Sequence, residues 1–348
     1  MLSGDSLGIS GGNPSKQHRV ARRQRCRFGF TGSCYTVVAM AKVTVNTKHL
    51  LSITDLDPKE IKSLLQHARD LKTETNASKP LKGKTIALLF GKPSLRTRVS
   101  FEIATANLGG NCLYLSPQEV GIGGREAISD IAQVLSRYVD CIVYRCFQHQ
   151  QIEEMAQYAS VPVINALSED EHPCQALADL TTMFERRENL RTTILAYIGD
   201  GNNVARSLAL GAASMGMTFR IASPQGYELS TEVLKQAAQI AAANGGQIEF
   251  LRDPVSAVED AHVVYTDVWS SMGQEEEASE REEAFKGYQV NPELMEQAAP
   301  DAIFMHDLPA HYGEEVPPGF LNHPQSVVFD QAENRLHSQQ ALLEALIG

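Results

Sequence analysis

From residue 45 onwards, short apolar runs alternate with segments of helical periodicity, and this alternation constrains the fold more than any other feature of the sequence. Strands that are separated by helices pair in parallel, because the chain must cross over between them. The first half therefore predicts a parallel sheet covered by helices. Its expected strands are residues 85–90, 112–115, 141–145 and 162–167, and its expected helices are 128–138, 152–158 and 173–187.

A charged stretch at residues 185–191 ends this first series, and a second series of the same kind follows it. The acidic run at residues 275–283 is expected to be a solvated loop. The two series predict an α/β fold of two domains, each a parallel sheet flanked by helices. In the second series the expected strands are residues 193–198, 218–222, 247–251, 262–266, 302–305 and 327–329, and the expected helices are 204–215, 231–243 and 335–347.

Residues 1–40 differ from the rest, with six basic side chains, one acid and no apolar periodicity. This composition is typical of an organelle transit peptide; the alternative is an extension upstream of a start at Met40. We expect residues 1–43 to be disordered. An upstream extension predicts a cytoplasmic protein, whereas a transit peptide predicts a protein of the mitochondrion or plastid.

Composition also excludes several partners. The net charge of -11 disfavours nucleic acid, because phosphate backbones attract basic faces. No apolar run reaches the ~18 residues that a membrane span needs. The cysteines outside the leader are scattered without a Cys-x-x-Cys pair, which predicts a reducing compartment and no metal.

The segment Ser94-Leu95-Arg96-Thr97-Arg98 follows the first expected strand and begins a helix. Unpaired N–H groups at a helix start attract anions, and a guanidinium can bind phosphate through two hydrogen bonds. The segment therefore predicts a phosphate site. The alternative is a serine that caps the helix, followed by two solvated arginines.

Two further segments place polar groups at strand ends or helix starts in the first half. His172-Pro173-x-Gln175 opens a helix, and its His and Gln are three residues apart, so they can face one ligand. Imidazole can donate to a carbonyl oxygen, and the Gln can hold an amide; the alternative is a capping His with a surface Gln. Arg145 ends an apolar strand, where it is either paired in a site or extends to solvent.

In the second half, the turn at residues 199–203 resembles the start of a nucleotide-binding unit. However, Val204 replaces the third small residue of Gly-x-Gly-x-x-Gly, and no acid for a ribose ends the next strand. A nicotinamide-dependent oxidoreductase is therefore disfavoured, and Asn203 offers an amide to a polar ligand instead. Asp267, with Ser271 and Met272 after it, suits the amino and carboxylate groups of an amino acid. The loop His306-Asp307-Leu308-Pro309 and the segment around Arg335 complete the set.

Together these segments resemble the aspartate/ornithine carbamoyltransferase superfamily, most closely its ornithine-specific branch, from about residue 46 to the end. The resemblance implies residues 44–187 as a carbamoyl-phosphate-binding domain, residues 192–332 as an ornithine-binding domain, and a helix at 333–348 that packs back on the first domain. It implies transfer of the carbamoyl group from carbamoyl phosphate to the side-chain amine of L-ornithine, giving L-citrulline and phosphate. It also implies a homotrimer, or a multiple of trimers, and no cofactor.

The resemblance further implies roles for individual residues. Catalytic roles fall on Arg96, Arg145, His172, Asp267 and Asp307. Carbamoyl phosphate is expected to contact Ser94, Leu95, Arg96, Thr97, Arg145, His172, Pro173, Gln175, Asp307, Leu308 and Arg335. Ornithine is expected to contact Asn203, Asp267, Ser271 and Met272.

Three positions depart from the usual pattern of that superfamily. Leu95 stands where Thr is frequent, which matters little if the contact uses the backbone N–H. Gly121 stands where a Gln or His often reaches a neighbouring subunit. Asp307 stands where Cys is usual, beside the acceptor amine. The alternative acceptors within the superfamily are another amine such as putrescine, or an N-acylated ornithine.

Overall fold

The computed structural model describes residues 43–73, 78–116, 120–121, 126–187, 189–271 and 273–348. The predicted leader lies outside these residues except for its last one, and so does Met272. No helix in the described part is long and apolar enough to cross a membrane.

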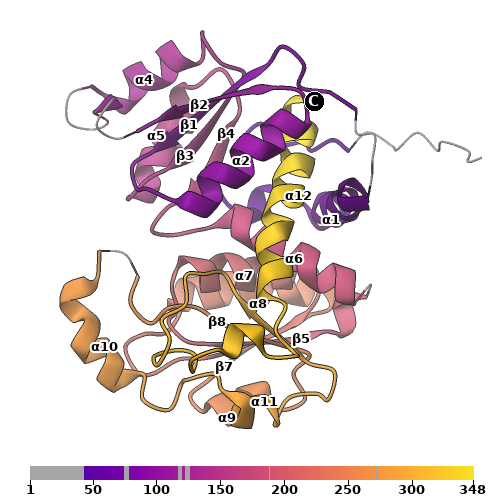
Figure 1. Ribbon diagram of the computed structural model, residues 1–348, viewed down its shortest axis with the longest axis vertical. Coiled ribbons are helices and arrows are strands. Elements are labelled where there is room, and N and C mark those ends of the chain that lie inside the picture. The colour runs from indigo at the N-terminus through magenta and orange to yellow at the C-terminus, as the bar shows by residue number, and fades with distance from the viewer. Residues whose placement is uncertain (1–42, 74–77, 117–119, 122–125, 188, 272) are drawn as a thin grey trace, which may run out of the picture. The chain divides into compact units, whose positions relative to one another are not determined.

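The first half folds as a four-stranded parallel sheet, in agreement with the prediction (Figure 1). Its strand order is β2-β1-β3-β4, and the inner strands β1 and β3 are almost completely buried. Apolar runs such as Ile86–Phe90 form strands of this kind, because both faces of a helix-covered parallel sheet lie away from water. The strands are β1 (Thr85–Phe90), β2 (Asn111–Leu115), β3 (Cys141–Arg145) and β4 (Val163–Leu167); the helices are α2 (Leu95–Asn107), α4 (Ile128–Leu135), α5 (His149–Tyr158) and α6 (Pro173–Arg186).

The second half folds as a five-stranded parallel sheet with the order β7-β6-β5-β8-β9. The predicted α/β class, with two parallel sheets flanked by helices, is therefore confirmed. The strands are β5 (Ile194–Ile198), β6 (Thr218–Ala222), β7 (Gln247–Leu251), β8 (Val263–Thr266) and β9 (Ile303–His306); the helices are α7 (Asn203–Ser214), α8 (Thr231–Asn244), α9 (Pro254–Val258), α10 (Ala278–Ala284) and α11 (Pro292–Met295).

Both sheets reverse their strand order at one point, and ligands of parallel sheets bind at such points. In the first sheet the reversal lies between β1 and β3, where Phe90 pairs with Arg145. In the second it lies between β5 and β8, where Tyr197 pairs with Tyr265. The ends of these four strands, and the turns and helix starts directly after them, carry most of the predicted site residues, so the topology itself gathers them.

The C-terminal helix α12 (Val328–Ile347) packs against α1 (Pro58–Thr73), α2 and α6, so the prediction that it returns to the first half is confirmed (Figure 1). It begins earlier than predicted, and the strand expected at residues 327–329 is wrong. Ser326 forms only an isolated bridge to Phe304, and the helix starts two residues later. The N-terminal part of α12 buries polar side chains, including Gln331, Asn334 and Ser338, which hid its periodicity.

Two other segments differ from the sequence-based expectation. The acidic run at residues 275–283 is not a loop but a 3-10 turn followed by α10. Arg281 explains the order there: it is buried, it donates to Asp200 Oδ2 at 2.9 Å and to the Trp269 carbonyl at 3.0 Å, and it lies over the Tyr227 ring. Helix α1 was not predicted, although the buried residues Ile61, Leu64, Leu65 and Ala68 follow a helical period.

Candidate active site

A cavity of about 1150 Å³ opens where the strand ends of the two sheets meet. Pro173 does not line it, because this proline begins α6 and is buried there, and Met272 lies outside the described residues. The remaining predicted site residues all line the cavity: Ser94, Leu95, Arg96, Thr97, Arg145, His172, Gln175, Asn203, Asp267, Ser271, Asp307, Leu308 and Arg335.

The start of α2 forms one wall of the cavity. Ser94 is the N-cap, and its Oγ accepts from the Thr97 N–H at 3.4 Å, as the capping alternative required. The serine nevertheless lines the cavity, so capping and an anion site coexist. Leu95 is 77% exposed. Its backbone, rather than its side chain, is therefore the part that lies nearest the helix start. Arg98 does not line the cavity: it pairs with Glu102 at 2.9 Å and lies over the Tyr114 ring.

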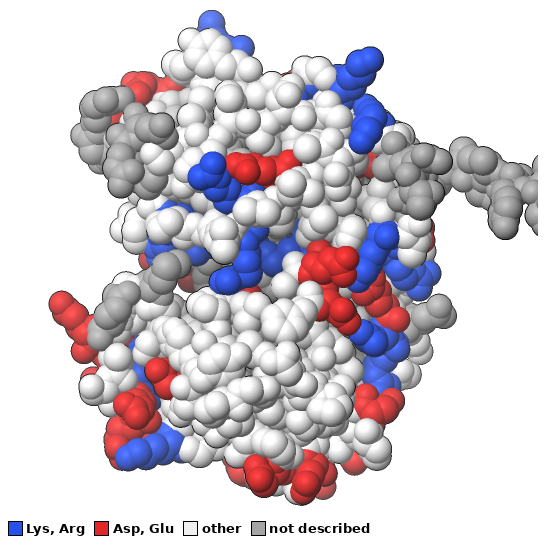
Figure 2. All heavy atoms as spheres, viewed as in Figure 1, with Lys and Arg blue, Asp and Glu red and all other residues white. Residues whose placement is uncertain are grey.

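Three guanidinium groups converge on this wall, from Arg96, Arg145 and Arg335. Burial, then the charges of Arg335 and Arg96, lower the pKa of Arg145 to about 10. Among the described residues, none of the three forms an ion pair with a carboxylate. Figure 2 shows basic side chains gathered across the middle of this face. Close cations without an acidic partner destabilise each other, so the wall is suited to bind an anion.

His172 and Gln175 lie beside these arginines at the start of α6. Burial, followed by the charges of Arg335, Arg145 and Arg96, holds the pKa of His172 well below its usual range. The imidazole is therefore neutral at physiological pH and can donate one hydrogen bond. Its backbone is fixed by a hydrogen bond from the His172 N–H to Ser207 Oγ at 2.8 Å, and Ser207 in turn donates to the buried Glu171.

Asp267 and two asparagines form the opposite wall, at the end of β8 and the start of α7. Asp267 Oδ2 accepts from Asn202 Nδ2 at 2.7 Å, and Oδ1 accepts from the Val268 N–H at 2.7 Å. Asn203 Nδ2 donates to the Ser168 carbonyl at 2.6 Å and so joins the two halves of the chain. Asn202 was not predicted; it caps α7, and its position in the turn after β5 was the available signal.

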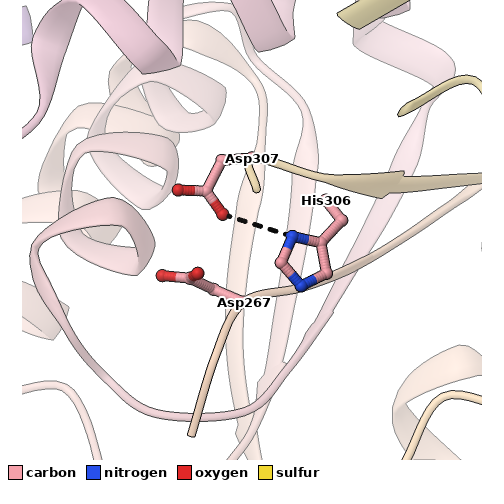
Figure 3. A group of neighbouring side chains, drawn as sticks. All are labelled: Asp267, His306 and Asp307. Carbon is pink, nitrogen blue, oxygen red and sulfur yellow. Dashed lines mark ion pairs between the residues drawn. The ribbon is translucent and has the colours of Figure 1, made fainter. Parts of the chain in front are cut away.

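A second carboxylate, from Asp307, lies next to Asp267, and Figure 3 shows both side chains with His306 beside them. Burial, and then the charge of Asp267, raise the pKa of Asp307 well above its usual range. Two carboxylates this close cannot both ionise easily, so the pair keeps a proton until a cation approaches. Among the described residues Asp307 Oδ1 has no hydrogen-bond partner. The pair is therefore suited to an ammonium group.

His306 supports the loop rather than the ligand. Its Nε2 lies 3.1 Å from Glu315 Oε1, and its Nδ1 accepts from the Leu308 N–H at 2.9 Å. Its Nδ1 also lies 3.7 Å from Asp307 Oδ1, which is too long for a hydrogen bond. Asp267, His306 and Asp307 have the donor types of a divalent-metal site, but both ring nitrogens of His306 are already engaged.

The variant Asp307→Cys is expected to retain activity and to reach its optimum at a lower pH. An ionised Asp307 stabilises the ammonium form of an acceptor amine and so raises the pH at which the reactive neutral amine appears. The uncharged thiol removes that effect. The measurement is the pH profile of kcat for both proteins between pH 6 and 10, and an unchanged profile would remove Asp307 from the mechanism.

Comparison with known proteins matches a separate family model to each half of the chain. Residues 48–185 match the family model for the carbamoyl-P binding domain of aspartate/ornithine carbamoyltransferase. Residues 192–346 match the model for the Asp/Orn binding domain of the same proteins.

Individual relatives are also similar over nearly their full length. The ornithine carbamoyltransferase of Pyrococcus abyssi is 51% identical over 309 residues, which is 88% of this chain and 98% of that protein. A solved structure of the Pyrococcus furiosus ornithine carbamoyltransferase has a TM-score of 0.85 at 48% identity, covering 89% of this chain and 99% of that one. The Giardia lamblia ornithine transcarbamoylase structure has a TM-score of 0.80 at 35% identity, covering 87% and 98%.

Proposed function

The chain belongs to the aspartate/ornithine carbamoyltransferase family, and from that premise we propose how its cavity transfers a carbamoyl group from carbamoyl phosphate to L-ornithine, giving L-citrulline and phosphate. One observation carries the proposal: three guanidiniums that form no ion pair with a carboxylate of the described residues, and a neutral imidazole, face a pair of carboxylates across one cavity. The cationic wall suits a phosphorylated donor, and the acidic wall suits the amine of the acceptor. We assign the donor to residues 44–187, with Arg335, and the acceptor to residues 192–332.

The donor is bound by its two ends. The phosphate lies at the start of α2, where backbone N–H groups, Ser94, Arg96 and Thr97 supply donors. The carbonyl oxygen points to Arg145 and His172, and the carbamoyl NH₂ to Gln175. As the amine attacks, negative charge develops on that oxygen, and fixed donors stabilise it more in the transition state than in the ground state.

The amine must be neutral to attack. Taking Lys as a model, its pKa of ~10.4 means that the neutral form at pH ~7.5 costs about 4 kcal/mol. Holding the amine against the carbonyl can lower the barrier by ~7–11 kcal/mol, so positioning outweighs this cost. Asp267 orients the amine, and the departing phosphate accepts its proton. No covalent intermediate is needed.

An acceptor panel tests the assignment. Carbamoyl phosphate is offered with ornithine, putrescine, N-acetylornithine or aspartate, and the ureido product is quantified. Ornithine is expected to have the highest kcat/KM, because Asp267, Asn203 and Ser271 together suit an α-amino acid end that putrescine lacks. A preference for putrescine or N-acetylornithine would reassign the acceptor, and no product from any amine would refute the function.

We also propose a homotrimer, or a multiple of trimers, with α2 at the contact between subunits. Helix α2 has an exposed apolar face formed by Leu95, Val99 and Ile103, which are 77%, 45% and 46% exposed. Leu113 on the edge strand β2 is 50% exposed. Apolar faces of this kind are usually covered by another chain, and this one adjoins the donor site.

The variant Ile103→Lys is expected to reduce the oligomer to monomers of 38.1 kDa, because a charge would be buried at the contact. Analytical ultracentrifugation gives the masses. Val255→Lys on α9 is the matched control, since Val255 is similarly exposed (49%) but lies in the second half. A wild-type monomer, or an Ile103→Lys oligomer of wild-type size, would refute this contact.

Finally, we propose arginine biosynthesis as the pathway and the cytoplasm as the location. The Pyrococcus furiosus relative is named as the anabolic enzyme. The cysteines Cys112, Cys141, Cys146 and Cys174 are all free, as expected in a reducing compartment. A transit peptide in residues 1–40, with import into a mitochondrion or plastid, is the alternative.

A further inference from the structure

Asp179 is a fully buried carboxyl group that does not line the cavity and has no part in the mechanism above. It lies on α6, one turn after Gln175, with three donors around it. Gln175 Nε2 and Gln331 Nε2 each donate to Asp179 Oδ1 at 2.8 Å, and the Tyr265 hydroxyl donates to Oδ2 at 3.1 Å. These donors come from α6, α12 and β8.

The Gln175 amide is thereby held at both ends. Its Nε2 donates to Asp179, and its Oε1 accepts from Arg335 Nη1, while Arg335 Nη2 donates to Thr97 Oγ1 at 2.8 Å. An ionised carboxylate only accepts and a guanidinium only donates. The reverse orientation of the amide would therefore place oxygen against oxygen and N–H against N–H. Asp179 and Arg335 together allow one orientation.

This orientation decides what Gln175 offers to a ligand. Gln175 and Arg335 both line the cavity, and with Oε1 on the Arg335 side the amide presents an acceptor there, which suits a ligand NH₂ group; the reversed amide would present donors. We propose that Asp179 is a positioning residue: by fixing the Gln175 amide, it sets the affinity for the carbamoyl part of the donor without touching the donor. The inference rests on the proposed function, in which Gln175 contacts the carbamoyl NH₂.

The same network reaches the loop after β9. Gln331 Oε1 accepts from the His306 N–H at 2.9 Å, and Gln331 Nε2 also lies 3.1 Å from the Tyr265 hydroxyl. One carboxyl group thus connects the donor-binding amide on α6 to the segment that carries Asp307 and Leu308.

Asp179→Asn is the direct test. An ionised Asp179 can only accept, whereas Asn can present either its oxygen or its NH₂ group to Gln175, so the reversed orientation of the Gln175 amide is no longer excluded. We expect the Kd for carbamoyl phosphate to rise about tenfold, while the Kd for inorganic phosphate changes less than about twofold, because phosphate has no NH₂ group. Both constants are measured by calorimetry, which does not depend on turnover.

The matched control is Thr182→Val, on the same helix. Thr182 is fully buried and accepts from Asn334 Nδ2 on α12 at 3.0 Å, so its loss weakens the same helix contact without reaching Gln175. We expect a lower Tm and wild-type Kd values for both ligands. If Asp179→Asn left both constants unchanged, or raised them equally, Asp179 would be structural and the proposal would be wrong.

Tyr265→Phe provides a second test that keeps the carboxyl group. Burial raises the pKa of Asp179 to about 7, opposed by hydrogen bonds from Gln175, Gln331 and Tyr265 and by the charge of Arg335. Tyr197 and Asp307 also interact electrostatically with this carboxyl group. A protonated Asp179 can donate as well as accept and no longer fixes the amide. Loss of the Tyr265 hydroxyl raises this pKa further.

Acidification should therefore begin to weaken carbamoyl phosphate binding at a higher pH in Tyr265→Phe than in Thr182→Val. Both variants bind the same ligand, so protonation of the ligand itself affects both profiles equally. Coincident profiles would overturn the proposal even if Asp179→Asn did not fold. A failure of the proposed function would be seen separately, because the wild type would then form no ureido product. The dissociation constants for carbamoyl phosphate and inorganic phosphate would still decide the role of Asp179.

Discussion

Replacing Arg145 by Met is expected to lower kcat/KM for carbamoyl phosphate by about 10²–10³-fold, the usual cost of losing one donor to a developing oxyanion. Arg145 ends β3 at the reversal point of the first sheet and is 5% exposed, so no other side chain can move into its place without disturbing the strand. The loss should appear in kcat as well as in KM, because the contact strengthens as charge develops.

The same variant should be more stable than the wild type, by about 1 kcal/mol or more, because a buried cation without an acidic partner is removed. The lowered pKa of Arg145 shows that the fold disfavours the charged form, and this charge is present at all pH values below about 10. Removing the charge should therefore increase the free energy of unfolding. Thermal unfolding checks this, with and without carbamoyl phosphate. Carbamoyl phosphate should raise the Tm of the wild type far more than that of the variant.

Arg220→Met is the matched control for Arg145→Met. Arg220 is also on a strand and partly buried, but it pairs with Glu249 at 3.1 Å and donates to the Glu259 carbonyl. Its loss should reduce stability and leave kcat/KM unchanged, the opposite of the Arg145 pattern. If Arg145→Met were destabilised and fully active, Arg145 would be structural.

Replacing Asp267 by Asn is expected to raise the KM for ornithine by at least about 10²-fold while the KM for carbamoyl phosphate changes little. The variant keeps the shape of the side chain but removes a buried charge that would face the ammonium group, and such a loss typically costs about 3–5 kcal/mol. Asn202 and the Val268 N–H, which now donate to Asp267, hold the carboxylate in position.

The pH dependence gives an independent check on Asp267. The charge of Asp267 is the second cause of the raised pKa of Asp307, after burial, so Asp267→Asn should lower that pKa. Any change in KM that follows protonation of Asp307 should then move to lower pH. Asp253→Asn is the control: Asp253 caps α9 and accepts from the Ser256 hydroxyl, outside the cavity lining, and Asn caps equally well. An equal rise in the KM values of both substrates would contradict an acceptor-specific role.

The strands were predictable because parallel strands buried on both faces form continuous apolar runs, and these runs stand out in the sequence. Thr85–Phe90, Cys141–Arg145, Thr218–Ala222 and Gln247–Leu251 have the predicted bounds. The site followed from the strands, since polar residues at the carboxyl ends of parallel strands meet at one edge.

The start of α12 was not predictable in the same way. Its first turns bury Gln331, Asn334 and Arg335, so polar side chains occupy the face that periodicity expects to be apolar. Asp179 was missed for a related reason. A carboxylate one turn beyond a glutamine of the candidate site has the sequence appearance of a solvated helix residue, and only the positions of Gln331 and Tyr265 show that it is enclosed. Whether a polar helix residue is buried or solvated is decided here by hydrogen-bond partners that are distant in the sequence.

Direct transfer of the carbamoyl group between two substrates in one cavity is tested most directly by carbon-13 NMR. Carbamoyl phosphate labelled at the carbonyl carbon is mixed with the protein and ornithine, and the labelled carbon is followed together with released phosphate. We predict that the signal passes to the ureido carbon of citrulline with one phosphate per citrulline, and that Arg145→Met and Asp267→Asn slow this conversion. Labelled carbamate or bicarbonate as the main product, or phosphate release that does not depend on ornithine, would contradict the account.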